Sequence, residues 1–331
     1  MRLFLKLFSL LIFLLAGLVG AAFWWINSPI GMRDAPVDFR ITPGSSLRAA
    51  AEQMRAAGIE INPDLLVLLA RWRGVETAIK AGSYSAAPGL TPEQLLAKLA
   101  RGDVTQGELT LVEGWTFRQW RARLDQHPDL KHDAQGLPEA ELRALLGIEG
   151  DYIEGWLFPD TYLFDKQSSD LELLARAHRS MKKRLDSAWL ERAADLPYKT
   201  PYEALIMASI VEKETGRHSD RPLVAAVFVN RLRKGMPLQT DPTVIYGLGE
   251  SFDGNLRKRD LQSDTPYNTY LRSGLPPSPI AMPGQASIQA ALHPANSDAL
   301  YFVARGDGSS QFSRTLDEHN KAVNKYQRGS K

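Results

Sequence analysis

The first feature of the hydrophobic pattern is an unbroken apolar segment, Leu7 to Ile26, that contains no charged residue. An apolar run of about 20 residues is long enough to cross a bilayer as a single helix. Arg2 and Lys6 precede the segment, and an aromatic cluster at residues 23–25 closes it. Because positive residues favour the cytoplasmic side of a membrane, the pattern predicts a transmembrane anchor over residues 7–26, with residues 1–6 in the cytoplasm.

A cleaved signal peptide is the alternative interpretation of this segment. Val19-Gly20-Ala21 is an acceptable small-residue cleavage site. The apolar run is longer than the usual core of a signal peptide and continues past that site, which favours an uncleaved anchor. In either case the remaining part of the chain is expected to work outside the cytoplasm.

A small mixed unit is predicted to follow the anchor. Residues 27–35 are polar and rich in proline and glycine, so we interpret them as a linker. The pattern over residues 36–104 predicts a β-α-α-β-α order: VDFRIT, LRAAAEQMRAAG, PDLLVLLARWRG, AGSYSA and LLAKLARG. This unit contains no catalytic constellation, which suits a binding or spacer module.

The larger part of the chain, residues 105–331, is predicted to form a second domain of mixed α+β class. A strand, GELTLVEG, precedes the helix TFRQWRARLDQ, for which Thr116 is the expected N-cap. A longer amphipathic helix is predicted at LELLARAHRSMKKRL. After Pro201 the chain becomes dense in turn signals and in polar and aromatic clusters. The chain is therefore expected to be α+β in two domains behind a membrane helix.

Composition excludes several classes of function. The 331 residues carry a net charge of +2, and lysine and arginine are scattered along the chain, so nothing indicates a nucleic-acid partner. The absence of cysteine excludes disulfides, thiolate metal sites and a cysteine nucleophile. The six histidines are dispersed, and neither a zinc-protease motif nor a phosphate-binding glycine loop is present. We therefore expect no metal and no cofactor.

One predicted helix ends in two glutamates, in the segment ASIVEKETG. Thr200 and Glu203 form a capping-box pattern around Pro201, and Gly216 is the expected C′ residue, so the helix is predicted over residues 201–215. Carboxylates are disfavoured at this end of a helix by the helix dipole. Their position therefore calls for a reason other than helix stability.

Glu212 and Glu214 are two positions apart, about 200° around the helix, so they cannot both face one pocket. Glu214 shares its face with Met207, Ile210 and Val211, where lost hydration would raise its pKa and keep a proton for general acid catalysis. A solvated helix end, in which Lys213 balances both glutamates, is the equally open alternative. A Ser209–Lys213 dyad, one helical turn apart, would instead indicate a hydrolase.

Three later segments combine turns with amide, hydroxyl and aromatic side chains: MPLQTDPTVIYGLG, TPYNTYLRSGLPPSPIAMPG and SQFSRTLDEHNKAV. Such segments can line a groove that binds an uncharged polymer rich in hydroxyl and amide groups. Ordinary turn chemistry and aromatic core packing would give the same composition. The segments therefore mark a candidate groove without fixing its residues.

Taken in chain order, EGWLFPDTY, ASIVEKETG, VFVNRLRKGMPLQTDPTVIYGLG, TPYNTYLRSGLPPSPIAMPG, ALHPA and LYFVARGDGSSQFSRTLDEHNKAV resemble the endolytic murein transglycosylase (YceG-like) family along essentially the whole chain. The resemblance implies a single-pass inner-membrane protein with a LysM-like subdomain at residues 36–104 and a periplasmic catalytic domain at 105–331. It implies cleavage of the MurNAc–GlcNAc bond within nascent peptidoglycan strands, leaving a 1,6-anhydro-MurNAc end, beside the synthases known as penicillin-binding proteins.

The resemblance also implies residue roles. The second glutamate of E-K-E-T, Glu214, corresponds to the essential residue and would act first as acid and then as base. Glu212 would support the helix end. The expected substrate-binding residues, from their motif positions, are Gln239, Asp241, Thr243, Tyr246, Tyr267, Asn268 and Asn320. A non-catalytic peptidoglycan-binding scaffold and a Ser209–Lys213 cell-wall hydrolase are the rival functions.

Overall fold

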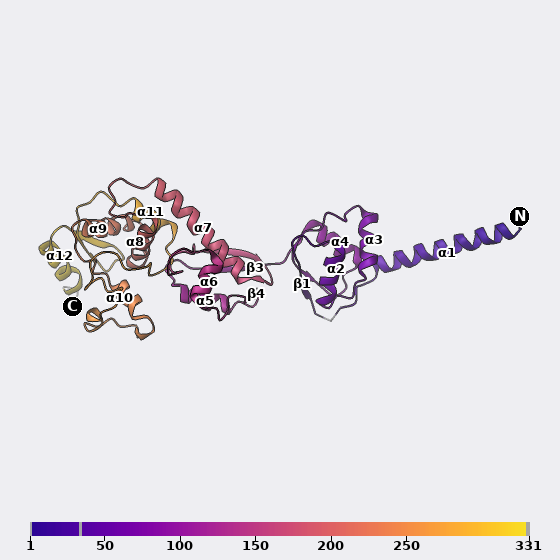
Figure 1. The fold of residues 1–331 in the computed structure, drawn as a ribbon, viewed down its shortest axis with the longest axis horizontal. Helices are drawn as coiled ribbons and strands as arrows, with labels where there is room; N and C mark the ends of the chain where they lie inside the picture. Colours follow the sequence, from indigo (N-terminus) through magenta and orange to yellow (C-terminus); the bar gives the residue numbers. More distant parts are fainter. Residues whose placement is uncertain (1, 33–34, 329–331) are drawn as a thin grey trace. The chain divides into compact units, whose positions relative to one another are not determined.

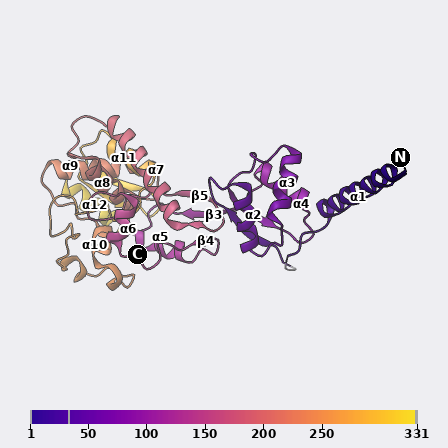
Figure 2. The ribbon, with the colours of Figure 1, turned by 45° about the vertical axis from the view of Figure 1, so that its right-hand side comes forward.

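The computed structural model describes residues 2–32 and 35–328. Contacts divide the chain into two units. The N-terminal unit comprises residues 1–108, 129–131 and 163–168, and the C-terminal unit comprises residues 109–128, 132–162 and 169–331. Figure 1 shows the elements of both units along the chain, and Figure 2 shows them from a second direction.

The N-terminal unit begins with a long helix, α1 (Arg2–Asn27). Its segment Phe4–Asn27 has a mean hydropathy of 2.4, and no residue of the apolar window within it is buried. By length and composition this helix can cross a membrane, and a signal sequence would have the same properties. The predicted apolar helix at the N-terminus is therefore present.

The remaining elements of the N-terminal unit follow the predicted order. They are β1 (Val37–Ile41), α2 (Leu47–Ala56), α3 (Pro63–Arg73), β2 (Gly82–Ala86) and α4 (Pro92–Arg101). β1 and β2 pair antiparallel, from Val37 opposite Ala86 to Ile41 opposite Gly82. Thr91 caps α4 through a complete capping box, and Gly102 ends it in the left-handed conformation.

The segment interpreted from sequence as a linker is partly a structural element. Ile30 is buried in the core of the N-terminal unit, and its backbone N–H donates to the carbonyl of Leu90 over 2.8 Å. Gly31 pairs with Glu60 through an isolated β-bridge. The proline- and glycine-rich composition suggested a free linker, but one isoleucine within it is apolar enough to be drawn into the core.

The C-terminal unit is a helical body with short paired strands at its periphery. The elements that follow α4 along the chain are β3 (Gln106–Leu111), α5 (Phe117–Asp125), β4 (Leu130–Lys131), α6 (Glu139–Leu146), β5 (Asp160–Asp165), β6 (Ser168–Ser169), α7 (Asp170–Leu190), α8 (Pro201–Glu214), α9 (Arg221–Arg233), α10 (Asp241–Leu248), η1 (Gly249–Ser251), η2 (Asp260–Gln262), α11 (Gln285–Leu292), β7 (Tyr301–Ala304), β8 (Ser310–Ser313), α12 (Leu316–Val323) and η3 (Asn324–Arg328). Of these, β4 belongs to the N-terminal unit, β3, β5 and β6 include residues of both units, and the others belong to the C-terminal unit. β3 pairs with β5, β4 with β6, and β7 with β8 in an antiparallel hairpin. The mixed α+β class predicted from the sequence is confirmed.

Helix α8 is the central element of the C-terminal unit. All of its side chains from Ala204 to Val211 are buried, and it packs against α7, α9, α10 and α11 (Figure 1). A helix that is apolar on all sides must be surrounded by other elements. The charged residues that follow Val211 lie where the helix leaves this core, so each one projects toward a different neighbour.

The ends of α8 only partly match the sequence-based prediction. Thr200 accepts the N–H of Glu203 over 3.2 Å, as an N-cap should, but the Glu203 carboxylate accepts the N–H of Lys199 rather than completing the capping box. At the other end Thr215 is extended, with φ −145°, and Gly216 does not take the left-handed conformation expected of a C′ residue. The chain therefore leaves α8 directly after Glu214 instead of closing with a glycine turn.

Candidate functional site

The C-terminal end of α8 opens onto a cavity of about 620 Å³, which we call the Glu214 cavity. Its walls come from α8, α9, the segment before α10, the β7–β8 hairpin and α12, all in the C-terminal unit. The lining residues are Glu214, Phe228, Arg231, Leu238, Gln239, Asp241, Tyr270, Tyr301, Phe302, Val303, Ala304, Ser310, Leu316, His319, Val323 and Gln327. The cavity thus combines carboxyl, guanidinium, amide and imidazole groups with aromatic rings.

Glu214 is the last residue of α8, and its carboxylate accepts a hydrogen bond from the Thr240 hydroxyl. Burial raises the pKa of the Glu214 carboxyl to about 6. The Thr240 hydrogen bond and the Arg231 charge lower that pKa, whereas the Asp241 carboxylate raises it further. At neutral pH a carboxyl with this pKa can both give up and take back a proton.

Thr240 is diverted from an ordinary capping role. It is the N-cap residue of α10, but its side chain accepts no helix N–H, which an N-cap threonine usually does. Its backbone N–H donates to the Thr269 hydroxyl over 3.1 Å, and its carbonyl accepts the Thr243 hydroxyl over 2.8 Å. These bonds fix Thr240 so that its own hydroxyl points at Glu214.

Arg231 supplies a buried positive charge at the cavity. Its guanidinium donates to the carbonyl of Leu300 over 2.7 Å and to that of Leu238 over 2.8 Å, with a longer contact to the Gln239 side-chain oxygen. The cation also lies 5.1 Å from the centre of the Tyr301 ring. Arg231 therefore fixes the segment before α10 against the start of β7 while its charge acts on Glu214.

Aromatic rings and a second carboxylate form other parts of the wall. Tyr301 and His319 stack with their ring centres 5.2 Å apart. Burial lowers the pKa of His319, and the Arg231 charge acts in the same direction, so its imidazole is neutral at neutral pH. The Tyr270 hydroxyl donates to the Asp241 carboxylate over 2.5 Å.

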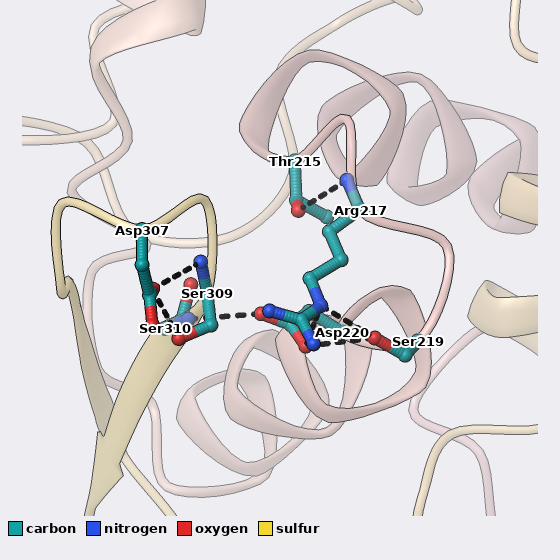
Figure 3. A network of polar contacts seen from close by, with 7 residues as sticks. All are labelled: Thr215, Arg217, Ser219, Asp220, Asp307, Ser309 and Ser310. Carbon is teal, nitrogen blue, oxygen red and sulfur yellow. Dashed lines mark hydrogen bonds and ion pairs between the residues drawn. The ribbon is translucent and has the colours of Figure 1, made fainter.

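The hairpin that carries Tyr301 is held by the loop between α8 and α9. Asp220 in this loop accepts the backbone N–H of Ser310, the first residue of β8, over 2.9 Å (Figure 3). Within the same loop the Arg217 guanidinium donates to the Ser219 hydroxyl over 2.9 Å. Asp220 is itself buried, so this contact between the α8–α9 loop and the hairpin is shielded from water.

Comparison with known proteins identifies the family. The sequence model of the YceG-like family matches residues 39–325. This chain belongs to the YceG-like family. An endolytic murein transglycosylase from Bacillus subtilis (strain 168) is 34% identical over 309 residues, covering 88% of this chain and 84% of that protein. The family resemblance predicted from six sequence segments is therefore confirmed.

Two further relatives support the assignment. An endolytic murein transglycosylase from Streptococcus pneumoniae serotype 2 is 27% identical over 317 residues, covering 86% of this YceG-like chain and 57% of that protein. A crystal structure of a YceG-like protein from Listeria monocytogenes is similar with a TM-score of 0.55 and 31% identity. That similarity covers 86% of this chain and 98% of the Listeria chain.

Four of the seven predicted substrate-binding residues of this YceG-like chain lie in the wall of the Glu214 cavity or beside it. Gln239 and Asp241 line the Glu214 cavity. Thr243 and Asn268 are fully buried beside it: the Thr243 hydroxyl contacts that of Thr269 over 2.8 Å, and the Asn268 amide donates to two backbone carbonyls. Thr243 and Asn268 therefore support the cavity wall from the protein interior and do not face the cavity.

The other predicted residues lie away from the Glu214 cavity. Tyr246 and Tyr267 meet edge to face at 4.8 Å, and the Tyr246 hydroxyl donates to the buried carboxylate of Glu154 over 3.1 Å. That carboxylate also accepts the N–H of Phe117, and burial raises the pKa of Glu154 to about 8. Asn320 is exposed on α12, next to the cavity residue His319.

Glu212 faces a different environment from Glu214. Its carboxylate accepts a hydrogen bond from Arg221 over 3.0 Å and one from the backbone N–H of Gly284 over 2.9 Å. The side chains of Glu212 and Arg221 are each only 5% exposed. The buried ion pair joins the end of α8 to the start of α9 and to the segment before α11, which agrees with the geometry of a supporting residue.

The Ser209–Lys213 pair does not have the geometry of a catalytic dyad. Ser209 is fully buried, its hydroxyl donates to the carbonyl of Ile206 over 2.7 Å, and it accepts the N–H of Ile280 over 3.0 Å. Lys213 is exposed and donates to the carbonyl of Gly114 over 3.1 Å. The serine is thus committed to packing, and the lysine points to another segment.

Sequence reasoning missed Arg231, Tyr270, Tyr301 and His319 as members of the site, although all four lie inside segments that were quoted for the family resemblance. An arginine within an otherwise apolar helical run is the signal that could have marked Arg231, because a buried guanidinium requires several acceptors. Over residues 2–32 and 35–328 there is no group of three or more histidine, aspartate or glutamate side chains placed to hold a metal.

Proposed function

We propose that this chain is a membrane-anchored endolytic lytic transglycosylase that cleaves the MurNAc–GlcNAc bond within peptidoglycan strands. The observation that carries the proposal is the Glu214 carboxyl: it lies in a cavity wall, is largely buried, and has a pKa raised to about 6. Relatives that cover most of this chain are named endolytic murein transglycosylases, which supports the same activity.

The proposed first step is general acid catalysis by Glu214. The protonated carboxyl donates its proton to the glycosidic oxygen, the bond from that oxygen to the muramyl C1 breaks, and the bonding electrons leave with the oxygen. Positive charge then develops on the muramyl ring. Thr240 and Arg231 favour the carboxylate that the acid leaves behind, because one donates a hydrogen bond to it and the other is a nearby cation.

The second step returns the proton to Glu214. The carboxylate removes the proton of the muramyl C6 hydroxyl, whose oxygen bonds to C1 and closes the 1,6-anhydro ring. The attacking C6 hydroxyl and the C1 carbon belong to the same sugar. Because they are already close together, the enzyme does not have to position a water molecule as a hydrolase must. The enzyme ends the cycle with a protonated Glu214, and no water is consumed.

Binding of the strand is assigned to the wall of the Glu214 cavity. Gln239 and Asp241 offer amide and carboxylate groups for sugar hydroxyls, and Tyr270 and Tyr301 offer rings for the apolar faces of sugars. Thr243, Tyr246, Tyr267, Asn268 and Asn320 stay predictions as substrate-binding residues. Glu212 is proposed as the support of the α8 end through its ion pair with Arg221.

The proposed location is the inner membrane, with α1 as an uncleaved anchor and the C-terminal unit in the periplasm. The apolar length of α1 and the positive residues Arg2 and Lys6 before most of it support this orientation. Nascent strands leave the synthases at the same membrane, so penicillin-binding proteins are the proposed partners. The β-α-α-β-α elements of the N-terminal unit are proposed as a LysM-like subdomain.

The presence of Asp241 in the same cavity makes the test sharper, because two carboxylates could also support hydrolysis. We would digest purified glycan strands with the wild type and with Glu214→Gln, Asp241→Asn and Glu212→Gln, and identify products by mass spectrometry. The proposal predicts products one water lighter than hydrolytic ones, their complete loss with Glu214→Gln, and anhydro ends that persist at lower yield with Asp241→Asn. Hydrated ends that require both Glu214 and Asp241 would indicate a hydrolase instead.

A further inference from the structure

We infer that helix α3 of the N-terminal unit docks on the outer surface of the phospholipid bilayer through an exposed apolar face. The face consists of Leu65, Leu68 and Trp72, which we call the α3 face. The inference rests on the proposed role of α1 as a transmembrane anchor. It concerns a surface with no part in the Glu214 cavity.

Helix α1 is joined to the rest of the N-terminal unit without a free linker. Trp25 and Ile26 in its last turn pack against the core of the N-terminal unit, and Ile30, four residues later, belongs to that core. Helix α1 also contacts α4 directly. The backbone bond from Ile30 to Leu90 and the bridge from Gly31 to Glu60 continue this attachment.

The distance along α1 places the N-terminal unit close to the membrane. Phe23 and Trp24 are exposed aromatic residues at the end of the apolar helix, as expected for the membrane interface. Ile26, which already packs on the unit, is two residues further, or about 3 Å along the helix axis. The polar layer of a bilayer is thicker than this, at roughly 5–7 Å per leaflet. The adjacent surface of the N-terminal unit must therefore lie within the headgroup layer.

Helix α3 has the composition of a helix that lies at the membrane interface. Leu65, Leu68 and Trp72 are spaced i, i+3, i+7 and lie on one side, with 40%, 64% and 68% of their surfaces exposed. Arg71 and Arg73 flank the tryptophan. Aliphatic residues with tryptophan and arginine at the edge are typical of helices that lie in the headgroup region.

The position of α3 agrees with this role. It packs on α4, the helix that contacts α1, and the Arg73–Glu93 ion pair of 3.0 Å joins the two helices. Figures 1 and 2 both draw α3 and α4 on the side of the N-terminal unit where α1 ends. Helix α3 therefore lies on the side of the N-terminal unit from which α1 leaves, and a bilayer that holds α1 would lie against that side.

A glycan strand is the competing occupant, because Leu68 also borders a hollow with Ser45, Ser46 and Thr77. Sugar recognition requires polar groups that converge beside an aromatic ring. The two leucines of the α3 face present only hydrocarbon, and a bilayer satisfies them better than a hydroxyl-rich polymer does. We therefore assign the face to lipid and leave the glycan as an outcome of the test.

The absence of cysteine in the chain allows a clean labelling experiment. A nitroxide would be attached to full-length Leu68→Cys, to Leu14→Cys in α1, and to Gln106→Cys at an exposed position of β3 as the matched control. Each protein would be reconstituted in vesicles of phosphatidylethanolamine and phosphatidylglycerol. Spin relaxation by lipid-soluble oxygen and by a water-soluble nickel complex would then report membrane contact, with and without purified glycan strands.

Lipid docking predicts that the label at residue 68 is shielded from nickel about threefold or more relative to residue 106, and that oxygen relaxes it more than nickel does, though less than at residue 14 in the bilayer interior. A label at 68 that is as open to nickel as 106, while 14 lies in the bilayer, would overturn the inference and leave the anchor intact. Shielding that appears only with added glycan would overturn it in favour of a glycan site. Exposure of residue 14 to nickel would refute the anchor as well.

Discussion

The hydroxyl of Thr240 offers the most specific perturbation of the proposed acid. It donates to the Glu214 carboxylate and lowers the pKa of that group, while burial raises the pKa to about 6. Thr240→Val keeps the shape of the side chain and removes the donor. Because the lost bond stabilised only the charged form, the pKa of Glu214 should rise further above its ordinary range.

The size of the effect follows from the strength of such a bond. A hydrogen bond to a charged group contributes about 1.5–3 kcal/mol, and about 1.4 kcal/mol corresponds to one pH unit. Taking the lower end, because valine leaves the burial of Glu214 unchanged, the loss of activity on raising the pH should move upward by about one unit. The first step needs the protonated acid, so kcat/KM falls as the pH passes its pKa.

The assay is the pH dependence of kcat/KM on soluble glycan strands, followed by release of anhydro products. Ser209→Ala is the matched control, since its buried hydroxyl lies on the same helix and bonds to the Ile206 carbonyl and the Ile280 N–H but to neither Thr240 nor Glu214. It should lower stability by about 1 kcal/mol and leave the descending part of the profile in place. The reasoning is refuted if Thr240→Val leaves the descent at the wild-type pH, or if Ser209→Ala moves it equally.

Four further predictions concern stability. Glu214→Gln should stabilise the fold by about 2 kcal/mol above pH 7, because the raised pKa disfavours the charged form in the folded state; this gain should vanish below about pH 4.5. Glu212→Gln should have the opposite sign and destabilise by about 3 kcal/mol, since it breaks the buried ion pair with Arg221. Glu154→Gln should flatten the loss of stability that the wild type shows as pH rises from 4.5 toward 8. Arg231→Lys should cost about 2–4 kcal/mol and lower kcat/KM, because lysine cannot donate to several carbonyls at once.

Denaturant titrations at a series of pH values would check these signs, with Ser209→Ala again as an uncharged control. Equal effects of Glu214→Gln and Glu212→Gln would contradict the different environments assigned to the two carboxyls. A pH-independent difference between wild type and Glu154→Gln would contradict the raised pKa of Glu154. For Arg231→Lys, unchanged stability would mean that its backbone hydrogen bonds contribute little.

Local features of the fold were predictable from the sequence because their causes are local. The start of α8 follows from Thr200 and Pro201, and the end of α4 follows from Gly102, since caps depend on a few neighbouring residues. The long apolar helix α1 was evident from the uninterrupted apolar run. The closing residue of α8 was mispredicted because Thr215 extends into the loop held by Asp220, a tertiary contact that the helix sequence does not encode.

The elements around the site were less predictable because they are buried on several sides. Helix α9 has buried residues all along Val224–Val229, so it lacks the alternation of polar and apolar positions that indicates a surface helix. The choice of Glu214 over Glu212 as the acid depended on the family resemblance. The environments of the two glutamates depend on Arg221, which contacts Glu212, and on Thr240, which contacts Glu214, and both partners lie outside α8. Only folding brings these partners together.

In the proposed mechanism the muramyl C6 hydroxyl, and not water, attacks C1, and Glu214 accepts the proton of that hydroxyl. The most direct measurement is digestion of purified glycan strands by the wild type in water labelled with a heavy oxygen isotope, followed by mass spectrometry of the new chain ends. The account predicts anhydro ends that contain no heavy oxygen, and no new ends with Glu214→Gln. Incorporation of one heavy oxygen at each new reducing end would contradict it and establish hydrolysis.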